Sequence, residues 1–276
     1  MNEIRHYTTY GNLIDKPVAE SKIFYIGELN RAINECELCL HYQPRYSSDG
    51  KLVALEALVR WQHPEHGILY PDSFIPFAEE VGLIHPLGLW VFEQCCNDLF
   101  LLRNQFGDDI KITINLSVSQ LEDLQIAQNI LDICQKYYLS LSSFEFEITG
   151  CSAVQDKTRI LQFCDMLISV GAEFSLEDFG TALTPLEYLC LLPVTKIKLE
   201  TDFINAIGVC RRSEILLKNL IELAHDMKMS IVAEGVEHAY QRDLLVKMNC
   251  DQLQGFLMHK PMAIEHLTCD AVCMSE

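Results

Sequence analysis

The chain contains 276 residues, of which 49% are hydrophobic and 22% are charged, and its 21 Lys and Arg against 39 Asp and Glu give a formal net charge of −18. This composition is typical of a soluble protein that buries a sizeable core. The acidic balance, without a basic stretch, argues against a broad surface for DNA or an anionic membrane, because both need clustered Lys and Arg. Metal ions or a few local cations would have to hold an anionic substrate.

The N-terminal sequence, beginning Met1-Asn2-Glu3-Ile4-Arg5, lacks the apolar core of a signal peptide, and no apolar run is long enough to cross a membrane. We therefore expect a cytoplasmic protein without membrane insertion. The twelve cysteines are expected to be reduced thiols, mostly buried. Cys36 and Cys39 have no second pair at zinc-finger spacing, so a structural zinc site is not expected.

Short β-rich runs alternate with amphipathic helical segments from about residue 22 onward. The predicted strands are Leu38–Gln43, Leu52–Leu58, Ile110–Leu116, Phe144–Ile148, Glu173–Glu177, Thr195–Leu199, Ser230–Ala233 and Cys250–Gln254. The clearest predicted helices are Pro86–Leu102 and Glu214–Met227. Eight strands alternating with helices indicate an α/β fold of the (β/α)8 TIM barrel type, and an open doubly wound sheet is the alternative. Residues 1–21 are expected to form an N-terminal arm or connector, and residues 22–276 a single domain.

Polar side chains follow the apolar part of most predicted strands. They are Glu56, Asn115, Glu147, Asp178, Lys198, Glu234 and Gln254, each at or near the C-terminal end of a different strand. In a barrel these ends converge on one face, where the active site of the fold lies, whereas an open sheet would spread them along an edge. This placement favours the barrel.

The acidic residues of this set predict a divalent cation, because ionised groups at the end of a buried strand are costly unless they are paired or bound to metal. Oxygen ligands without His or Cys favour Mg²⁺ or Mn²⁺ over zinc. Glu177 and Asp178 are adjacent and suited to bridge two metals, which together support phosphoryl displacement. Lys198 would then be a fixed cation beside phosphate or water, and Glu234 a general base. Alternatively, each carboxylate is merely solvated or paired, and Lys198 only neutralises surplus acid.

The nine histidines do not form a metal-binding set in the sequence, and we expect all of them in loops or at the surface. His63 and His66 are predicted to lie in a loop after the second strand, and His238 follows Glu237. The chain has no nucleophile elbow, phosphate-binding loop or dinucleotide fingerprint. Serine hydrolase, nucleoside triphosphatase and dinucleotide-dependent chemistries are therefore not indicated.

These residues make the sequence resemble the EAL domain family of bacterial cyclic di-GMP phosphodiesterases, from about residue 22 to the C-terminus. The matching blocks are Tyr42-Gln43-Pro44, Glu56-Ala57-Leu58-Val59-Arg60-Trp61 with His63-Pro64, Phe74-Ile75-Pro76 with Ala78-Glu79-Glu80, Asn115-Leu116-Ser117, Glu147-Ile148-Thr149, Asp178-Phe179-Gly180-Thr181, Leu192-Pro193-Val194, Ile197-Lys198, Val232-Ala233-Glu234-Gly235-Val236-Glu237 and Gln254-Gly255-Phe256 before Pro261. The resemblance implies an EAL-type barrel that hydrolyses cyclic di-GMP to linear pGpG with Mg²⁺ or Mn²⁺.

The resemblance also implies a role for individual residues. The implied metal ligands are Glu56, Asn115, Glu147, Glu177 and Asp178; the implied catalytic residues are Glu234 as general base, Lys198 near the attacking water and Gln254 as a residue that places this water; the implied substrate contacts are Gln43, Arg60 and Glu237. A homodimer through surfaces next to the loop that carries Asp178 is a further implication, and a protein partner is an alternative one.

Three departures from the family pattern fall on the metal-bridging loop or its supports. Glu177 stands where the family has aspartate, Gly150 where it has glutamate, and Glu200-Thr201 where it has Asp-Arg. The loop also reads Ala182-Leu183-Thr184-Pro185 in place of Gly-Tyr-Ser-Ser. We therefore expect an active but weakened phosphodiesterase; the alternative is an inactive EAL module that serves as a cyclic di-GMP receptor or as a protein-interaction domain.

Overall fold

A computed structural model describes residues 18–149, 154–179 and 187–268 of the chain. The family departures at Gly150 and at Ala182–Pro185 lie outside these residues, and the side chain of Asp178 is likewise not described.

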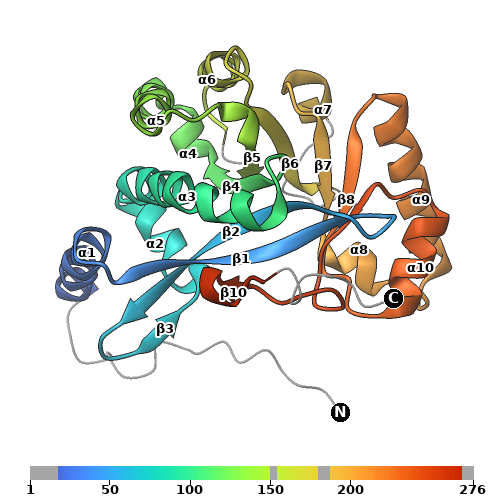
Figure 1. Cartoon of the computed structure of the whole chain (residues 1–276), viewed down its shortest axis with the longest axis horizontal. Coiled ribbons are helices and arrows are strands. Elements are labelled where there is room, and N and C mark those ends of the chain that lie inside the picture. The colour runs from blue at the N-terminus through green and yellow to red at the C-terminus, as the bar shows by residue number, and fades with distance from the viewer. Residues whose placement is uncertain (1–17, 150–153, 180–186, 269–276) are drawn as a thin grey trace.

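The centre of the molecule is a closed barrel of eight strands (Figure 1). The strands of the sheet are β1 Leu38–Ser47, β2 Leu52–His63, β3 Gly67–Leu69, β4 Lys111–Ser117, β5 Phe144–Thr149, β6 Glu173–Phe179, β7 Lys196–Leu199, β8 Ser230–Ala233, β9 Gln252–Leu253 and β10 Met262–Ala263. Their order is β10-β1-β9-β8-β7-β6-β5-β4-β2-β3, and an additional β1–β2 pairing closes the ring. The short β3 and β10 stand outside the ring as extra partners of β2 and β1. The predicted (β/α)8 barrel is confirmed.

The first two strands depart from the expected alternation of strand and helix. Strand β1 pairs antiparallel with both β2 and β9, whereas the other seven strands of the ring pair in parallel with one another. Only the turn Ser48–Lys51 separates β1 from β2, and a parallel connection needs a crossover of a dozen or more residues. Gly50 has a φ of 87°, a left-handed conformation that this tight turn requires and that glycine adopts without strain.

Helices cover the outside of the barrel (Figure 1). They are α1 Val18–Asn34, α2 Ile75–Glu80, α3 Ile84–Phe106, α4 Val118–Leu121, α5 Leu124–Tyr137, α6 Lys157–Ile168, α7 Glu187–Leu191, α8 Thr201–Asn205, α9 Arg211–Asp226 and α10 Ala239–Lys247, with short 3-10 turns η1 Pro71–Ser73, η2 Leu141–Ser143 and η4 Ile264–His266. Helix α9, predicted over Glu214–Met227, buries Leu217, Ile221 and Ala224 on one face, and Leu220 beside them is half-buried. Helix α1 begins at Val18 and so runs through the predicted boundary between residues 21 and 22.

Capping residues in the sequence set several helix limits. The side chain of Asp123 accepts a hydrogen bond from the backbone N–H of Gln125 at the start of α5. At the start of α6, the side chain of Asp156 accepts hydrogen bonds from the backbone N–H groups of Thr158 and Arg159. Helix α3 ends at Gly107, whose φ of 97° lets the chain turn away.

The alternation along β5 decides which side chains enter the barrel. Phe144 and Phe146 point outward and pack against Phe92 of α3 in tilted ring contacts, with centroids 5.1 and 5.9 Å from that of Phe92. Glu145 and Glu147, which lie between them in the sequence, therefore point to the barrel interior. The apolar core thus lies between strands and helices, and charged groups fill part of the barrel itself.

Candidate active site

Three carboxylates surround one lysine in the upper part of the barrel, near the C-terminal ends of the parallel strands. The ammonium nitrogen Nζ of Lys198 on β7 lies 2.5 Å from Oε2 of Glu147 on β5 and 3.4 Å from Oε2 of Glu56 on β2. It also forms an ion pair with Glu234, which directly follows β8. We call Lys198, Glu56, Glu147 and Glu234 the upper cluster. Lys198 and Glu147 are fully buried, and the side chain of Glu234 retains 21% exposure.

Two amide side chains hold the Glu56 carboxylate from either side. Nδ2 of Asn115 donates to Oε1 of Glu56 over 3.1 Å, and Nε2 of Gln254 donates to its Oε2 over 2.7 Å. Nε2 of Gln254 also contacts Oε1 of Gln43 at 3.3 Å, and Nε2 of Gln43 donates to the backbone oxygen of His259 at 3.1 Å. The structure therefore brings together all three amides that the sequence analysis assigned to the site.

Charge and burial oppose one another within the upper cluster. Burial, together with the negative charges of Glu56 and Glu177, raises the pKa of Glu147 well above its ordinary value despite Lys198. Burial alone would lower the pKa of Lys198, but the surrounding glutamates outweigh it and hold this pKa well above its ordinary value. For Glu56, burial is outweighed by Lys198 and the amide donors, and its pKa is lowered. Lys198 thus stays charged, and the carboxylates outnumber it.

The donor atoms of the site fit a hard divalent cation. Oδ1 of Asn115 and Oε1 of Gln254 are buried and accept no hydrogen bond from the described residues, although each belongs to an amide whose nitrogen is anchored on Glu56. Carboxylate and amide oxygens are the ligands that Mg²⁺ and Mn²⁺ prefer. Among the described residues, no three His, Cys, Asp or Glu side chains are arranged to hold a metal ion, and the carboxylates of the upper cluster are paired with Lys198 instead.

The backbone that carries Glu234 and Gln254 is tightly constrained. Gln254 donates its backbone N–H to the oxygen of Ala233, and Val236 donates to the oxygen of Gln254. A Cβ at Gly255 would lie 2.2 Å from the backbone oxygen of Val236, so only glycine permits this crossing. Gly235 has a φ of 68°, and a Cβ there would meet the side chain of Thr201. The residue at 201, where the chain departs from the family pattern, therefore packs directly beside the residue that follows Glu234.

The other predicted site residues have different environments. Arg60 lies on the same face of β2 as Glu56, four residues further along the strand. Glu177 on β6 is half-buried, and its negative charge acts on both Glu147 and Lys198. Asp178 follows it in β6. Glu237 is exposed, and its carboxylate forms no hydrogen bond or ion pair with a described residue.

A second set of buried and half-buried charges, which the sequence analysis did not identify, lies beneath the upper cluster. Nη2 and Nη1 of Arg45 on β1 contact the two carboxylate oxygens of Glu145 at 2.6 and 3.0 Å, and Nη1 lies 3.5 Å from Oε1 of Glu147. Lys196 lies 3.0 Å from Glu145 and 2.6 Å from Glu173, which also pairs with Lys111. We call Arg45, Glu145, Lys196, Glu173 and Lys111 the lower layer. The Phe-Glu-Phe-Glu alternation of β5 was the available signal, because it places Glu145 on the same face as Glu147.

The expectation of a loop or surface position is wrong for His63. This residue ends β2, is buried, and its Nδ1 accepts hydrogen bonds from the backbone of Glu65 and His66 at 3.1 and 3.3 Å. Its Nε2 lies 3.4 Å from Oε1 of the buried Glu28 on α1. Packing of α1 against the end of β2 therefore buries a histidine that the sequence places beside a proline.

All nine described cysteines are free thiols, and the buried ones are Cys95, Cys96, Cys134, Cys164 and Cys250.

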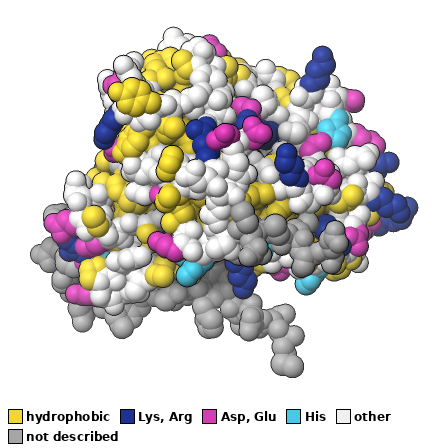
Figure 2. All heavy atoms as spheres, viewed as in Figure 1, with side chains coloured by type: hydrophobic (Ala, Val, Ile, Leu, Met, Phe, Trp, Pro, Cys, Tyr) yellow, Lys and Arg dark blue, Asp and Glu magenta, His cyan; other side chains and the backbone are white. Residues whose placement is uncertain are grey.

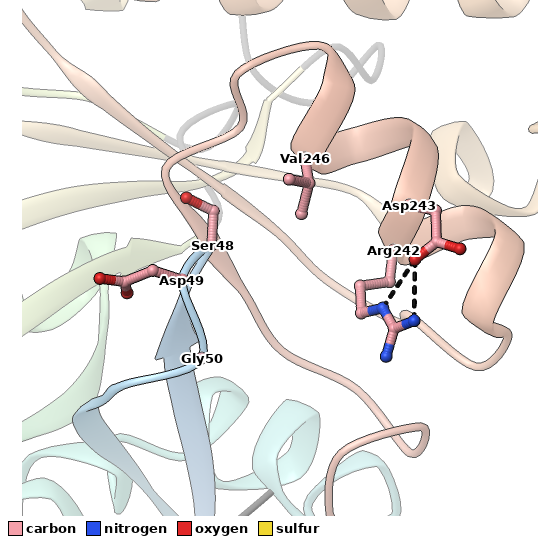
Figure 3. Close-up of a pocket in the computed structure, with 6 residues that line it drawn as sticks. All are labelled: Ser48, Asp49, Gly50, Arg242, Asp243 and Val246. Atoms are coloured by element: carbon pink, nitrogen blue, oxygen red, sulfur yellow. Dashed lines mark hydrogen bonds and ion pairs between the residues drawn. The ribbon is translucent and has the colours of Figure 1, made fainter. Parts of the chain in front are cut away.

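The pocket described next lies outside the barrel, and its lining contains none of the site residues predicted from the sequence. Figure 2 shows acidic and basic side chains interspersed on one face, with hydrophobic side chains gathered on its left. A shallow pocket of about 400 Å³ lies between the β1–β2 turn and α10 (Figure 3). Its lining includes Asp49, Val246 and the Arg242–Asp243 ion pair, and none of the predicted site residues. We therefore place the candidate site in the barrel interior.

Comparison with known proteins identifies the class to which this barrel belongs. The family model described as EAL domain matches residues 26–261. The chain is 32% identical over 250 residues to the bifunctional diguanylate cyclase/cyclic di-GMP phosphodiesterase MucR of Pseudomonas aeruginosa. The aligned region covers 90% of this chain and 36% of the relative. It is 33% identical over 234 residues to the cyclic di-GMP phosphodiesterase PdeR of Escherichia coli, covering 85% and 35% of the two chains. This chain thus spans about a third of the length of these curated relatives.

Solved structures give the same result. A PaMucR phosphodiesterase in complex with c-di-GMP superposes with a TM-score of 0.81 at 33% identity, covering 87% of this chain and 98% of that one. The EAL enzyme Bd1971 in its cAMP- and cyclic-di-GMP-bound form gives a TM-score of 0.84 at 27% identity, covering 91% and 69%. The chain belongs to the EAL domain family. In the described part of the chain, no helix has the length and apolar character that a membrane crossing requires.

Proposed function

We propose that this EAL domain hydrolyses one phosphodiester bond of cyclic di-GMP to give linear pGpG, and that the reaction depends on Mg²⁺ or Mn²⁺. The observation that carries the proposal is the upper cluster, in which three buried or half-buried carboxylates share one lysine. Beside them lie two amide oxygens that accept no hydrogen bond from the described residues. This surplus of negative charge has no structural benefit by itself, because each buried carboxylate costs free energy unless a cation compensates it. The relatives named as cyclic di-GMP phosphodiesterases support this substrate.

In this proposal, Glu56, Asn115, Glu147, Glu177 and Asp178 hold the divalent ions. When bound, such ions lower the pKa of water and stabilise the charge of phosphoryl oxygens. Glu234 takes the proton of the attacking water, because it is the carboxylate of the cluster that retains solvent exposure. Lys198 fixes the position of Glu234 and places a positive charge where negative charge develops on the phosphate. Gln254, anchored on Glu56 and Gln43, orients the water through its amide oxygen, which has no hydrogen-bond partner in the described part of the chain.

Gln43 and Arg60 are the proposed substrate contacts on β1 and β2, and Glu237 is the proposed contact beyond β8. The guanidinium of Arg60 supplies the forked donors that suit a phosphate. The domain, predicted as residues 22–276, is proposed to include the whole of α1 from Val18, and the residues before this helix are the proposed arm or connector. A homodimer through surfaces next to the loop that follows β6 is also part of the proposal, to be measured by analytical ultracentrifugation.

The test is to incubate the purified protein with cyclic di-GMP and either Mg²⁺ or Mn²⁺ and to measure pGpG by chromatography. Glu234→Gln, which preserves the size of the side chain, serves as the control for a contaminating enzyme. Titration calorimetry with Ca²⁺ measures binding separately from turnover. Binding without pGpG formation would instead identify a cyclic di-GMP receptor, and absence of binding with all three ions would reject the proposed substrate.

A further inference from the structure

The guanidinium of Arg60 is buried, and most of its hydrogen-bond donors have no acceptor among the described residues. Arg60 retains only 5% exposure, and its one hydrogen bond to a described residue runs from Nη1 to the backbone oxygen of Val59 at 2.8 Å. Its Nε is buried and has no acceptor among the described residues. A guanidinium presents five N–H donors, so most of its donor capacity is free for an anion.

The ring of Tyr70 lies against this guanidinium. The carbon Cζ of Arg60 is 5.0 Å from the centroid of the Tyr70 ring, within the range of a cation–π contact. Tyr70 is nevertheless 61% exposed, so its ring contributes little to the core. An exposed aromatic ring that covers a buried cation needs an explanation other than the stability of the fold.

The backbone of Tyr70 is fixed on both sides. It follows β3, whose last residue Leu69 pairs with Trp61 of β2, and this register places Tyr70 beside Arg60. Pro71 restricts the preceding residue to extended conformations, and Tyr70 has φ −95° and ψ 156°. Both the backbone nitrogen and Oγ of Ser73 donate to the backbone oxygen of Tyr70, over 3.0 and 2.6 Å. The strand pairing and these hydrogen bonds therefore fix the backbone that places the Tyr70 ring beside Arg60.

We infer that Tyr70 is a positioning residue, which holds the guanidinium of Arg60 in the orientation that binds a phosphate oxygen of the substrate. This inference rests on the proposed function. The contact is made by the π face of the Tyr70 ring, so it restricts the arginine side chain without using up one of the guanidinium's hydrogen-bond donors. Pre-ordering a binding side chain lowers the entropy that is lost when the ligand binds. Tyr70 itself need not touch the substrate.

The test compares Tyr70→Ala with Tyr70→Phe, because only the first removes the ring. Tyr70→Ala is expected to weaken cyclic di-GMP binding in Ca²⁺ by roughly 2- to 5-fold, the range of an exposed cation–π contact. In Mn²⁺ it should raise KM by a similar factor with little change in kcat, because the upper cluster is untouched. Tyr70→Phe should bind as wild type does. Tyr240→Ala, which removes a comparably exposed ring stacked on His238, is the matched control and should change nothing.

A double-mutant cycle with Arg60→Met separates positioning from direct contact. If Tyr70 acts through Arg60, the effect of Tyr70→Ala disappears in the Arg60→Met protein, and Arg60→Lys repeats the test should the methionine variant not fold. An undiminished effect in that background would overturn the inference, because Tyr70 would then contact the substrate itself. Equal affinities of wild type and Tyr70→Ala would also overturn it while leaving the proposed function intact. If wild type binds no cyclic di-GMP, the proposed function fails and the inference fails with it.

Discussion

The upper cluster and the lower layer use the same residue types but differ in their balance of charge. In the lower layer, three cations (Arg45, Lys196 and Lys111) surround two carboxylates, Glu145 and Glu173. In the upper cluster, one cation, Lys198, contacts three carboxylates. Arg45 joins the two sets through its 3.5 Å contact with Glu147.

The difference separates a structural use of charge from a functional one. Burial acts on Glu145 and Glu147 alike, but Arg45 and Lys196 outweigh it at Glu145 and lower the pKa of that carboxyl. At Glu147, two neighbouring carboxylates add to burial and the pKa rises. The lower layer is therefore complete as it stands, whereas the upper cluster stores a negative charge that a bound cation would neutralise.

The largest expected effect comes from unbalancing the lower layer. Arg45→Met leaves Glu145 buried without its bidentate partner, and such a change costs about 3–5 kcal/mol of unfolding free energy. Urea denaturation measures this loss. In the double variant Arg45→Met with Glu145→Met, the buried pair is replaced by apolar side chains, so most of the stability should return. A double variant as unstable as the single one would show that the lower layer does more than neutralise charge.

Glu234→Gln should separate function from stability in the upper cluster. Loss of a general base lowers kcat by about 10²–10⁴-fold, while cyclic di-GMP affinity changes little because the proton moves only in the transition state. Removing one of three carboxylates around a single lysine should leave the urea midpoint near the wild-type value. Chromatographic pGpG assays and urea titrations of the same preparations measure both quantities. Turnover at the wild-type rate would remove Glu234 from the role of base.

Metal ions should stabilise the protein through the upper cluster alone. At a concentration 100 times its Kd, Mn²⁺ should add about 2.7 kcal/mol to the unfolding free energy. Thermal unfolding with and without EDTA measures this. Glu56→Gln is expected to reduce the metal-dependent shift, whereas Glu173→Gln in the lower layer should retain it. An equal shift in both variants would place the metal elsewhere.

The smallest expected effect is the pH dependence of the stability that Glu173 of the lower layer contributes. Burial alone would raise the pKa of Glu173, but Lys111 and Lys196 outweigh it and hold the pKa below its ordinary value of 4.5. The unfolded state therefore binds protons more readily, so this stabilisation is present above pH 4.5 and disappears as the pH falls through the lowered pKa. Because Glu173 is one-third exposed, Glu173→Gln should cost less than about 1 kcal/mol at pH 7 and nothing in acid. A loss that persists at acid pH would point to packing instead of charge.

The sequence by itself determined the barrel and the members of the upper cluster. Short β-rich runs located the strands and helical periodicity located α9. Because the C-terminal ends of parallel strands meet on one face, Glu56, Glu147, Lys198 and Glu234 were predicted to lie together. The first two strands were located as well, but only strand pairing showed that β1 runs antiparallel to β2 and β9.

Tertiary structure alone decided the contacts between distant parts of the chain. Arg45 and Glu145 are 100 residues apart, and alternation along a strand does not tell which face becomes the barrel interior. His63 is buried because Glu28 of α1 packs on it, and Tyr70 lies on Arg60 because β3 folds back along β2. Local patterns specify elements, but the partner of a charged group is set by how those elements pack, since electrostatic contacts depend on distance in space and not along the chain.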